Sequence, residues 1–500
     1  MTEPQTTRST PAAPSVPSAR RAVFYAFGQR YLAFVFQLAT SIILARLLTP
    51  QETGVFSLAA AAVAIGTILR EFGTTDYVVS QKDISPQKLR AAYTVTVGFA
   101  WATAAVLFIA AYPLAAHYNE PGLATVMHVL CLNFALVPLG SIATAMLTKS
   151  LRFDVLFWIQ TASVVVGAVV TVVCALVGLS SQSPAWGSVA GIATTVVILL
   201  VRDPASVLML PGLHDLRHVL RFGGTLTVAR IIESIANRSP DFIVSGMLGF
   251  HAGGVLSKAS SLNAGFYDFF ASAVVRVATP VLAAARHGNT GVADGYRHAI
   301  VMMAAVQWLF FGLMGITAPE LVLVLFGQPW VEAVPILQIG AVQGLLYAPF
   351  MLCTPLLTAC GAAGAQLRIN LVYGVALVVA LAVGCLHSLE MAVLLSVSAH
   401  LIRMALFSVA TRQQCGISTR SVVAGLGSTA LVCGAAALCA WSTRLGMNAL
   451  NQPAWLTLIC TVAASVLAFL MSATVAKHPL VGELRRLLAA LPTTRKPPTV

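Results

Sequence analysis

The chain alternates long apolar stretches with short polar ones over almost its whole length. A helix needs about 20 predominantly apolar residues to cross the hydrocarbon layer of a membrane. Fourteen stretches approach or exceed that length, so we predict an all-α polytopic membrane protein with about 14 transmembrane helices. The predicted spans cover residues 22–48, 53–79, 91–112, 122–147, 154–179, 184–201, 222–248, 253–279, 296–317, 330–358, 366–387, 389–411, 419–442 and 453–475.

The composition agrees with this pattern. Hydrophobic residues make up 58% of the chain and charged residues 9%, whereas soluble domains carry about 25% charged residues. These values exclude a soluble fold, a secreted disulfide scaffold and a nucleic-acid-binding protein. The net charge of +13 follows from topology, because Lys and Arg concentrate in alternate loops, as in cytoplasmic loops of membrane proteins. The same distribution predicts a multi-pass protein with both termini in the cytoplasm.

An internal repeat relates residues 28–57 to residues 228–257 at an offset of two hundred residues. Polar residues inside predicted spans coincide at this offset: Arg30 with Arg230, Gln37 with Asn237, and Ser41 with Asp241. The seventh span thus corresponds to the first, an even offset of six spans, so both halves keep the same orientation, with a site expected between them. The repeat predicts two pseudo-symmetric six-helix bundles followed by two C-terminal helices.

The repeat and the loop composition divide the chain into six parts. We predict a disordered cytoplasmic tail at 1–20, an N-terminal six-helix lobe at 21–201, a cytoplasmic amphipathic linker at 202–221, a C-terminal six-helix lobe at 222–411, helices 13 and 14 at 412–476, and a cytoplasmic tail at 477–500.

The seventh predicted span carries a polar stripe. Its members are spaced for one helical face over about four turns: Arg230, Glu233, Ser234, Asn237, Asp241 and Ser245. A charged side chain at mid-membrane costs at least ~2.5–3.5 kcal/mol, so such a face is expected to line a water-filled cavity. Internal ion pairs at i, i+3 are the alternative, Arg230 with Glu233 and Arg238 with Asp241.

Other spans add candidate cavity residues. Arg30, Gln37 and Ser41 lie in the first span, Asp268 and Arg276 in the eighth, and Arg403 in the twelfth. Snorkelling to the membrane surface is the alternative for Arg276 and for Lys258. The planar guanidinium of arginine suits phosphate, and amide and hydroxyl groups suit sugars. Together these residues predict a site for an anionic, sugar-bearing molecule.

The sequence offers no sign of catalysis. It contains no GxxxxGK[ST], GxSxG or HExxH motif, and its nine cysteines lack metal-ligand spacing. We therefore expect a protein that is not an enzyme, with no catalytic residues, metal or cofactor.

Three segments resemble a known family: 41–56 (SIILARLLTPQETGVF), 70–82 (REFGTTDYVVSQK) and 241–256 (DFIVSGMLGFHAGGVL). They are similar to Wzx-type polysaccharide flippases of the multidrug/oligosaccharidyl-lipid/polysaccharide exporter superfamily. The resemblance implies a V-shaped pair of six-helix bundles around a cationic cavity, with Arg30, Arg230, Arg276 and Arg403 where cavity cations are expected. The last two helices resemble those of the lipid II flippase branch.

The resemblance also implies a function in the bacterial cytoplasmic (inner) membrane. An undecaprenyl-pyrophosphate-linked oligosaccharide would move from the inner to the outer leaflet by alternating access, for exopolysaccharide or lipopolysaccharide biosynthesis. Implied partners are the lipid bilayer and the polysaccharide polymerase and chain-length machinery. A cation-coupled multidrug exporter of the same superfamily remains open through Glu233, Asp241 and Asp268, as does a non-transporting polysaccharide assembly factor.

Overall fold

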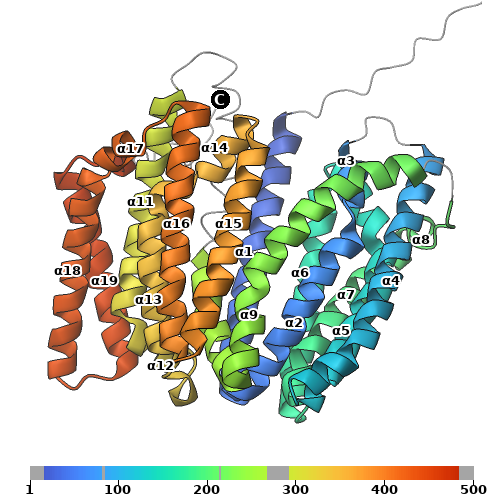
Figure 1. Cartoon of the computed structure of the whole chain (residues 1–500), viewed down its shortest axis with the longest axis horizontal. Helices are drawn as coiled ribbons and strands as arrows, with labels where there is room; N and C mark the ends of the chain where they lie inside the picture. Colours follow the sequence, from blue (N-terminus) through green and yellow to red (C-terminus); the bar gives the residue numbers. More distant parts are fainter. Residues whose placement is uncertain (1–15, 81–84, 213–215, 267–291, 483–500) are drawn as a thin grey trace, which may run out of the picture.

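The computed structural model describes residues 16–80, 85–212, 216–266 and 292–482 (Figure 1). Every regular element in these ranges is helical. The first half contains α1 Val16–Leu47, α2 Pro50–Glu71, α3 Thr74–Ser80, α4 Pro86–His117, α5 Pro121–Lys149, α6 Phe153–Leu176, η1 Ser180–Gln182, α7 Ser183–Arg202 and α8 Pro204–Val207. The second contains α9 Leu216–Phe266, α11 Val292–Ile316, α12 Ala318–Leu325, η3 Gln328–Trp330, α13 Ala333–Tyr347, η4 Ala348–Phe350, α14 Cys353–Ala359, α15 Ala363–Cys385, α16 Leu389–Cys415, α17 Thr419–Gly425, α18 Gly427–Ala449 and α19 Ala454–Val475.

Twelve helical stretches among the described residues are long and apolar enough to cross a membrane. The predicted spans 222–248 and 253–279 are not among them. Both overlap α9, a 51-residue helix whose charged residues lower its hydropathy, and the second extends beyond the described residues. The all-α polytopic fold is therefore confirmed with twelve candidate spans, and the count of 14 stays a prediction.

Three predicted elements differ in detail. The run 53–79 is divided, because α2 ends at Glu71 and Phe72 adopts a left-handed conformation with φ 38° before α3 begins. The run 330–358 is likewise divided into α13, η4 and α14. The predicted linker 202–221 holds the short α8, and its last residues already belong to α9. The second predicted lobe therefore shares its first helix with the end of this linker.

The turn between α1 and α2 is determined locally. Thr49 caps α2, its hydroxyl accepting from the Glu52 backbone N–H while the Glu52 carboxylate accepts from the Thr49 backbone N–H. Pro50 at the first helical position has no N–H that would need a partner. In Figure 1 this turn lies at the same end of the molecule as the bend of α9 at Gly249, where φ is 86°. We call this end the turn end.

At the turn end, α2 and α9 pack backbone against backbone. A Cβ atom on Gly54 would lie 1.9 Å from the carbonyl oxygen of Phe250, and one on Gly254 would lie 1.8 Å from that of Pro50. Each glycine and each carbonyl residue is matched by its counterpart two hundred residues away. The offset of the sequence repeat is therefore also the offset of a reciprocal contact, which only glycine permits.

The last two helices pack beside α11 and α12 at one edge of the molecule (Figure 1). Phe469 and Ala473 of α19 join Val432 and Ala436 of α18 in a cluster that includes Ala305 of α11. At the turn end, Arg444 of α18 pairs with the mostly buried Glu320 of α12 at 2.8 Å. These contacts join α18 and α19 to the second half.

Adding a methyl group at the glycine contact should destabilise the fold. We expect Gly54→Ala or Gly254→Ala to lower the free energy of unfolding by about 1–3 kcal/mol, because the two backbones must separate. Gly434→Ala in α18, where an added Cβ meets nothing within 4 Å, is the matched control and should be neutral or stabilising by up to about 1 kcal/mol. Thermal unfolding of the detergent-solubilised protein checks this. Equal melting temperatures for all three variants would contradict the contact.

His478, after α19, predicts a pH dependence of stability. Its Nδ1 accepts from the Leu480 backbone N–H and its Nε2 lies 3.0 Å from the Thr429 hydroxyl. Burial, and then nearby His298, lower the pKa of His478 below the ordinary 6.5. The unfolded ring therefore takes up a proton that the folded ring resists, so this contribution is present above about pH 6.5 and is lost below it.

We expect the melting temperature to fall as the pH drops below about 6.5, and His478→Gln to fall less steeply. The glutamine side chain can still donate to Thr429. Thermal scans at a series of pH values, with wild type and variant compared at each pH, separate this histidine from the others. Parallel pH curves would show that His478 contributes nothing.

Candidate functional site

Two cavities flank the polar face of α1. The first, here called the hydroxyl cavity, has a volume of about 610 Å³ and lies among α1, α2, α6, α7 and α9. Eight hydroxyl side chains line it: Thr40, Ser41, Thr53, Ser163, Thr171, Ser188, Ser257 and Ser261. Small residues, including Gly167, Gly187 and Gly191, leave the space open. Such a lining offers many hydrogen bonds and little charge.

The second, here called the apolar cavity, has a volume of about 550 Å³ and lies among α1, α9, α11, α12 and α19. Leu, Phe, Met and Val side chains dominate its lining. Gln37, Ser41 and Ser261 line both cavities. The α1 positions predicted from the sequence, Gln37 and Ser41, thus lie where a polar space meets an apolar one.

Lys258 of α9 is the one charged residue among the described residues that line the hydroxyl cavity. Only 7% of it is exposed. Its Nζ donates to the carbonyl and hydroxyl oxygens of Ser41 at 3.1 and 3.2 Å, and lies 5.4 Å from the ring centroids of Phe326 and Trp330. Lys258 is thus buried and held against α1.

Sequence reasoning left Lys258 between a functional role and snorkelling, and did not include it among the candidate site residues. A signal was available in the repeat, because the counterpart of Lys258 is Leu58, which is fully buried. A lysine at the position that corresponds to a buried leucine indicates that its ammonium group either has polar partners within the protein or binds a ligand.

Asp241 lies in the contact between α9 and α2. The Ser57 hydroxyl donates to its carboxylate at 3.1 Å, and Arg238 lies 3.9 Å away. The predicted Arg238–Asp241 pair is therefore present. Asp241 lines neither cavity in the described part of the chain, so its charge acts between the two halves of the molecule.

The polar stripe of α9 changes along its length. Asp241 is mostly buried and Ser245 is buried near the bend, where a Cβ on Gly253 would lie 2.2 Å from the Ser245 hydroxyl. Farther from the turn end, the remaining charged and amide members of the stripe are exposed: Arg230, Glu233 and Asn237. The stripe is packed at the turn end and open toward the opposite end.

The other predicted cations have different positions. Arg403 of α16 is surrounded by aromatic rings, with its guanidinium carbon 4.7 Å from Tyr373, 5.4 Å from Phe407 and 5.6 Å from Tyr347. Stacking stabilises its charge inside the second half, away from the linings of both cavities. Arg30 is half-buried on α1. Asp268 and Arg276 lie outside the described residues.

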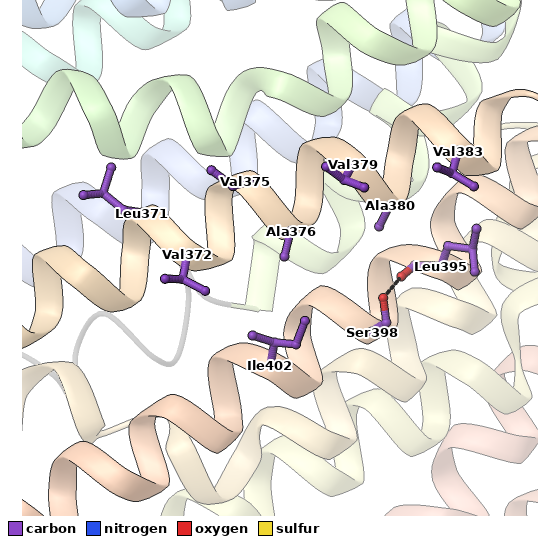
Figure 2. Close-up of a pocket in the computed structure, with 10 residues that line it drawn as sticks. All are labelled: Leu371, Val372, Val375, Ala376, Val379, Ala380, Val383, Leu395, Ser398 and Ile402. Carbon is purple, nitrogen blue, oxygen red and sulfur yellow. Dashed lines mark hydrogen bonds between the residues drawn. The ribbon is translucent and has the colours of Figure 1, made fainter.

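A third space lies between α15 and α16, with a volume of about 670 Å³ (Figure 2). Its lining is apolar apart from Ser398, whose hydroxyl donates to the Leu395 carbonyl at 2.6 Å. The groove suits hydrocarbon, whereas the hydroxyl cavity offers groups that can form hydrogen bonds.

Comparison with known proteins gives relatives in polysaccharide assembly. Residues 43–335 match a family model described as polysaccharide biosynthesis protein. The chain is 25% identical over 309 residues to lipopolysaccharide biosynthesis protein WzxC of Escherichia coli (strain K12), covering 61% of this chain and 62% of that one. It is 26% identical over 341 residues to succinoglycan biosynthesis transport protein ExoT of Rhizobium meliloti (strain 1021), covering 66% of each. The matches thus span just under two thirds of these relatives.

Solved structures share the fold. Lipid II flippase MurJ in an inward closed conformation superposes with a TM-score of 0.71 at 10% identity, covering 92% of this chain and 100% of that chain. An inward-facing multidrug resistance MATE family transporter of the MOP superfamily gives a TM-score of 0.57 at 14% identity, covering 78% and 96%. At these identities the likeness concerns the fold alone.

The exposed part of the stripe should be in water when the protein is in a bilayer. We expect Asn237→Cys to react with a membrane-impermeant maleimide in proteoliposomes, after the nine natural cysteines are replaced. Ile109→Cys of α4, 69% exposed in the bare protein, lies on an apolar helix and should stay unlabelled because lipid covers it. Failure of Asn237→Cys to react from either side would contradict a water-filled space along the stripe.

Proposed function

Because this chain belongs to the polysaccharide biosynthesis protein family, we propose that it is a flippase for a lipid-linked sugar. The cargo is an undecaprenyl-pyrophosphate-linked oligosaccharide repeat unit. It moves from the inner to the outer leaflet of the cytoplasmic membrane, where polymerase and chain-length machinery use it for surface polysaccharide. The names of the relatives, a succinoglycan transport protein and a lipopolysaccharide biosynthesis protein, support this substrate class.

The observation that carries the proposal is the lining of the hydroxyl cavity. Four of its eight hydroxyl groups donate to backbone carbonyls, so their oxygens can accept from sugar hydroxyls: Thr40, Ser163, Thr171 and Ser261. The Gln37 amide offers both a donor and an acceptor. Lys258 supplies a positive charge for a phosphate group. The adjoining apolar cavity gives a hydrocarbon chain a place beside the same α1 residues. A molecule with a sugar, a phosphate and a lipid part matches this combination.

The orientation of the charges favours export. With cytoplasmic termini, the turn end faces outward and the exposed part of the α9 stripe opens to the cytoplasm, where Arg230 and Arg30 attract the anionic headgroup. An anion that moves outward across a membrane negative inside gains ~2.3 kcal/mol per charge per 100 mV. Alternating access then requires the contacts at the turn end to part while the opposite end closes.

A cation-coupled multidrug exporter is the second candidate, and the fold shared with a MATE transporter supports it. Such an exporter needs carboxylates toward its cargo. Neither cavity lining contains one among the described residues, and Asp241 is engaged by Ser57 and Arg238. The lining therefore favours an anionic cargo.

Deleting the gene should cause lipid-linked repeat units to accumulate while surface polymer falls. We expect the intact gene to reverse both effects, and the double variant Arg30→Gln/Arg230→Gln to fail at normal protein level, because the headgroup loses its cationic attraction. The matched control removes two charges elsewhere, at the exposed Arg412 and Arg420, and should restore export. Labelled sugars in the extracted lipid fraction give the measurement.

Other results would exclude the flippase. Unchanged lipid-linked sugar with altered sensitivity to cationic drugs would favour the multidrug exporter. Full activity of the double variant in restoring surface polymer would favour a non-transporting assembly factor.

A further inference from the structure

Lys258 is a buried cation stabilised by dipoles and rings. Both of its hydrogen bonds go to Ser41. Its ammonium group also lies over the rings of Phe326 and Trp330. No carboxylate pairs with it in the part of the chain that the structure describes. A buried charge without a counter-ion keeps a strong attraction for an anion that enters its cavity.

The same lysine belongs to the contacts that close the turn end. Its partner Ser41 lies one turn before Ala45, whose carbonyl accepts from the Trp330 indole N–H at 2.8 Å. Arg46 in turn donates to the Val324 carbonyl at 2.6 Å. These are carbonyls in the last turns of α1 and α12, which have no partner inside their own helices. Lys258, Trp330 and Arg46 thus fasten α1 to the second half of the molecule.

We propose that Lys258 is the phosphate-binding residue of the cargo site and, through this binding, a latch that the cargo releases. The proposal rests on the flippase function proposed above. When a phosphate or pyrophosphate group enters the hydroxyl cavity, the ammonium group exchanges the Ser41 oxygens for phosphate oxygens. The bond between α9 and α1 is then lost, and the turn end opens more readily.

The exchange is favourable because of the charges involved. Hydrogen bonds between two charged groups are shorter and stronger than those from an ammonium group to a neutral carbonyl or hydroxyl. The Ser257 and Ser261 hydroxyls line the same cavity within one turn of Lys258 and can complete the phosphate shell. A ligand shifts a conformational equilibrium only through its different affinity for the two states. Here the two states differ in the Lys258–Ser41 hydrogen bonds, which the anion must replace to bind Lys258 in the closed state.

The experiment measures the separation of the two halves at the turn end. Spin labels are placed at the exposed Asn119 and Val331. Each label is next to an aromatic residue that contacts the opposite half. The Tyr118 hydroxyl donates to the Phe242 carbonyl, and the Trp330 indole N–H donates to the Ala45 carbonyl. The full-length protein without natural cysteines is reconstituted in nanodiscs. Distances are recorded with undecaprenyl pyrophosphate, with inorganic pyrophosphate, and with sulfate at matched ionic strength.

We expect undecaprenyl pyrophosphate to add a longer-distance population in the wild type. Lys258→Met, which keeps the length of the side chain without its charge, should raise the half-saturating concentration by roughly tenfold to a hundredfold. It should also show part of the longer population before any ligand is added. Lys258→Arg should keep the response. A response to inorganic pyrophosphate as well would show that the phosphate groups suffice, and a response to the lipid alone would show that the chain is needed for entry.

Two results would overturn the latch. One is a Lys258→Met protein whose distances respond to the ligands like those of the wild type. The other is a wild type that responds to sulfate as strongly as to pyrophosphate, or that responds to neither undecaprenyl pyrophosphate nor inorganic pyrophosphate. Complementation of the deletion strain is measured with the same variants. If the distance measurements contradict the latch but the wild-type gene still clears lipid-linked repeat units from the deletion strain, the flippase function stands. If the wild-type gene does not clear them, the flippase function itself is wrong.

Discussion

The contact between Gly54 and Gly254 brings the two halves of the molecule together at the turn end. Each glycine lies against a carbonyl oxygen of the opposite segment, so the backbones approach more closely than any side chain would allow. Around this contact the pairs Ser57–Asp241 and Lys258–Ser41 occupy related positions on the two sides. Tyr118 and Trp330 each donate to a backbone carbonyl of the facing helix. α2 and α9 are held together here, and Lys258 of α9 bonds Ser41 of α1 beside the cavities.

Several buried charges among the described residues are stabilised in different ways. Glu320 and Arg444 neutralise one another between α12 and α18. Arg403 is surrounded by three aromatic rings. Asp241 has a hydroxyl donor and an arginine. Lys258 has only backbone, hydroxyl and ring partners among the described residues, and it is the one that lines a cavity. This difference separates a residue available to a ligand from residues whose charge is already compensated.

The two cavities beside α1 combine opposite chemistries along a shared edge. Gln37, Ser41 and Ser261 face both a space rich in hydroxyl groups and a space lined by apolar side chains. A wholly soluble cargo would gain little from the second space, and a simple lipid would gain little from the first. A headgroup joined to a long hydrocarbon chain can use both, which is the physical basis of the proposed flippase.

The sequence by itself determined the membrane class and twelve of the spans, because the bilayer imposes length and hydropathy on each span separately. It also determined the repeat, since Gly54 and Gly254 occur at its offset. The stripe on α9 followed from helical periodicity, and so did the Arg238–Asp241 pair. Only the tertiary structure decided which charged residues reach a cavity. Arg403 and Lys258 are both cations inside predicted spans, and the sequence alone does not separate them. Packing of distant helices placed rings around the first and a hydroxyl-lined space beside the second, and such long-range contacts are not encoded in local spacing.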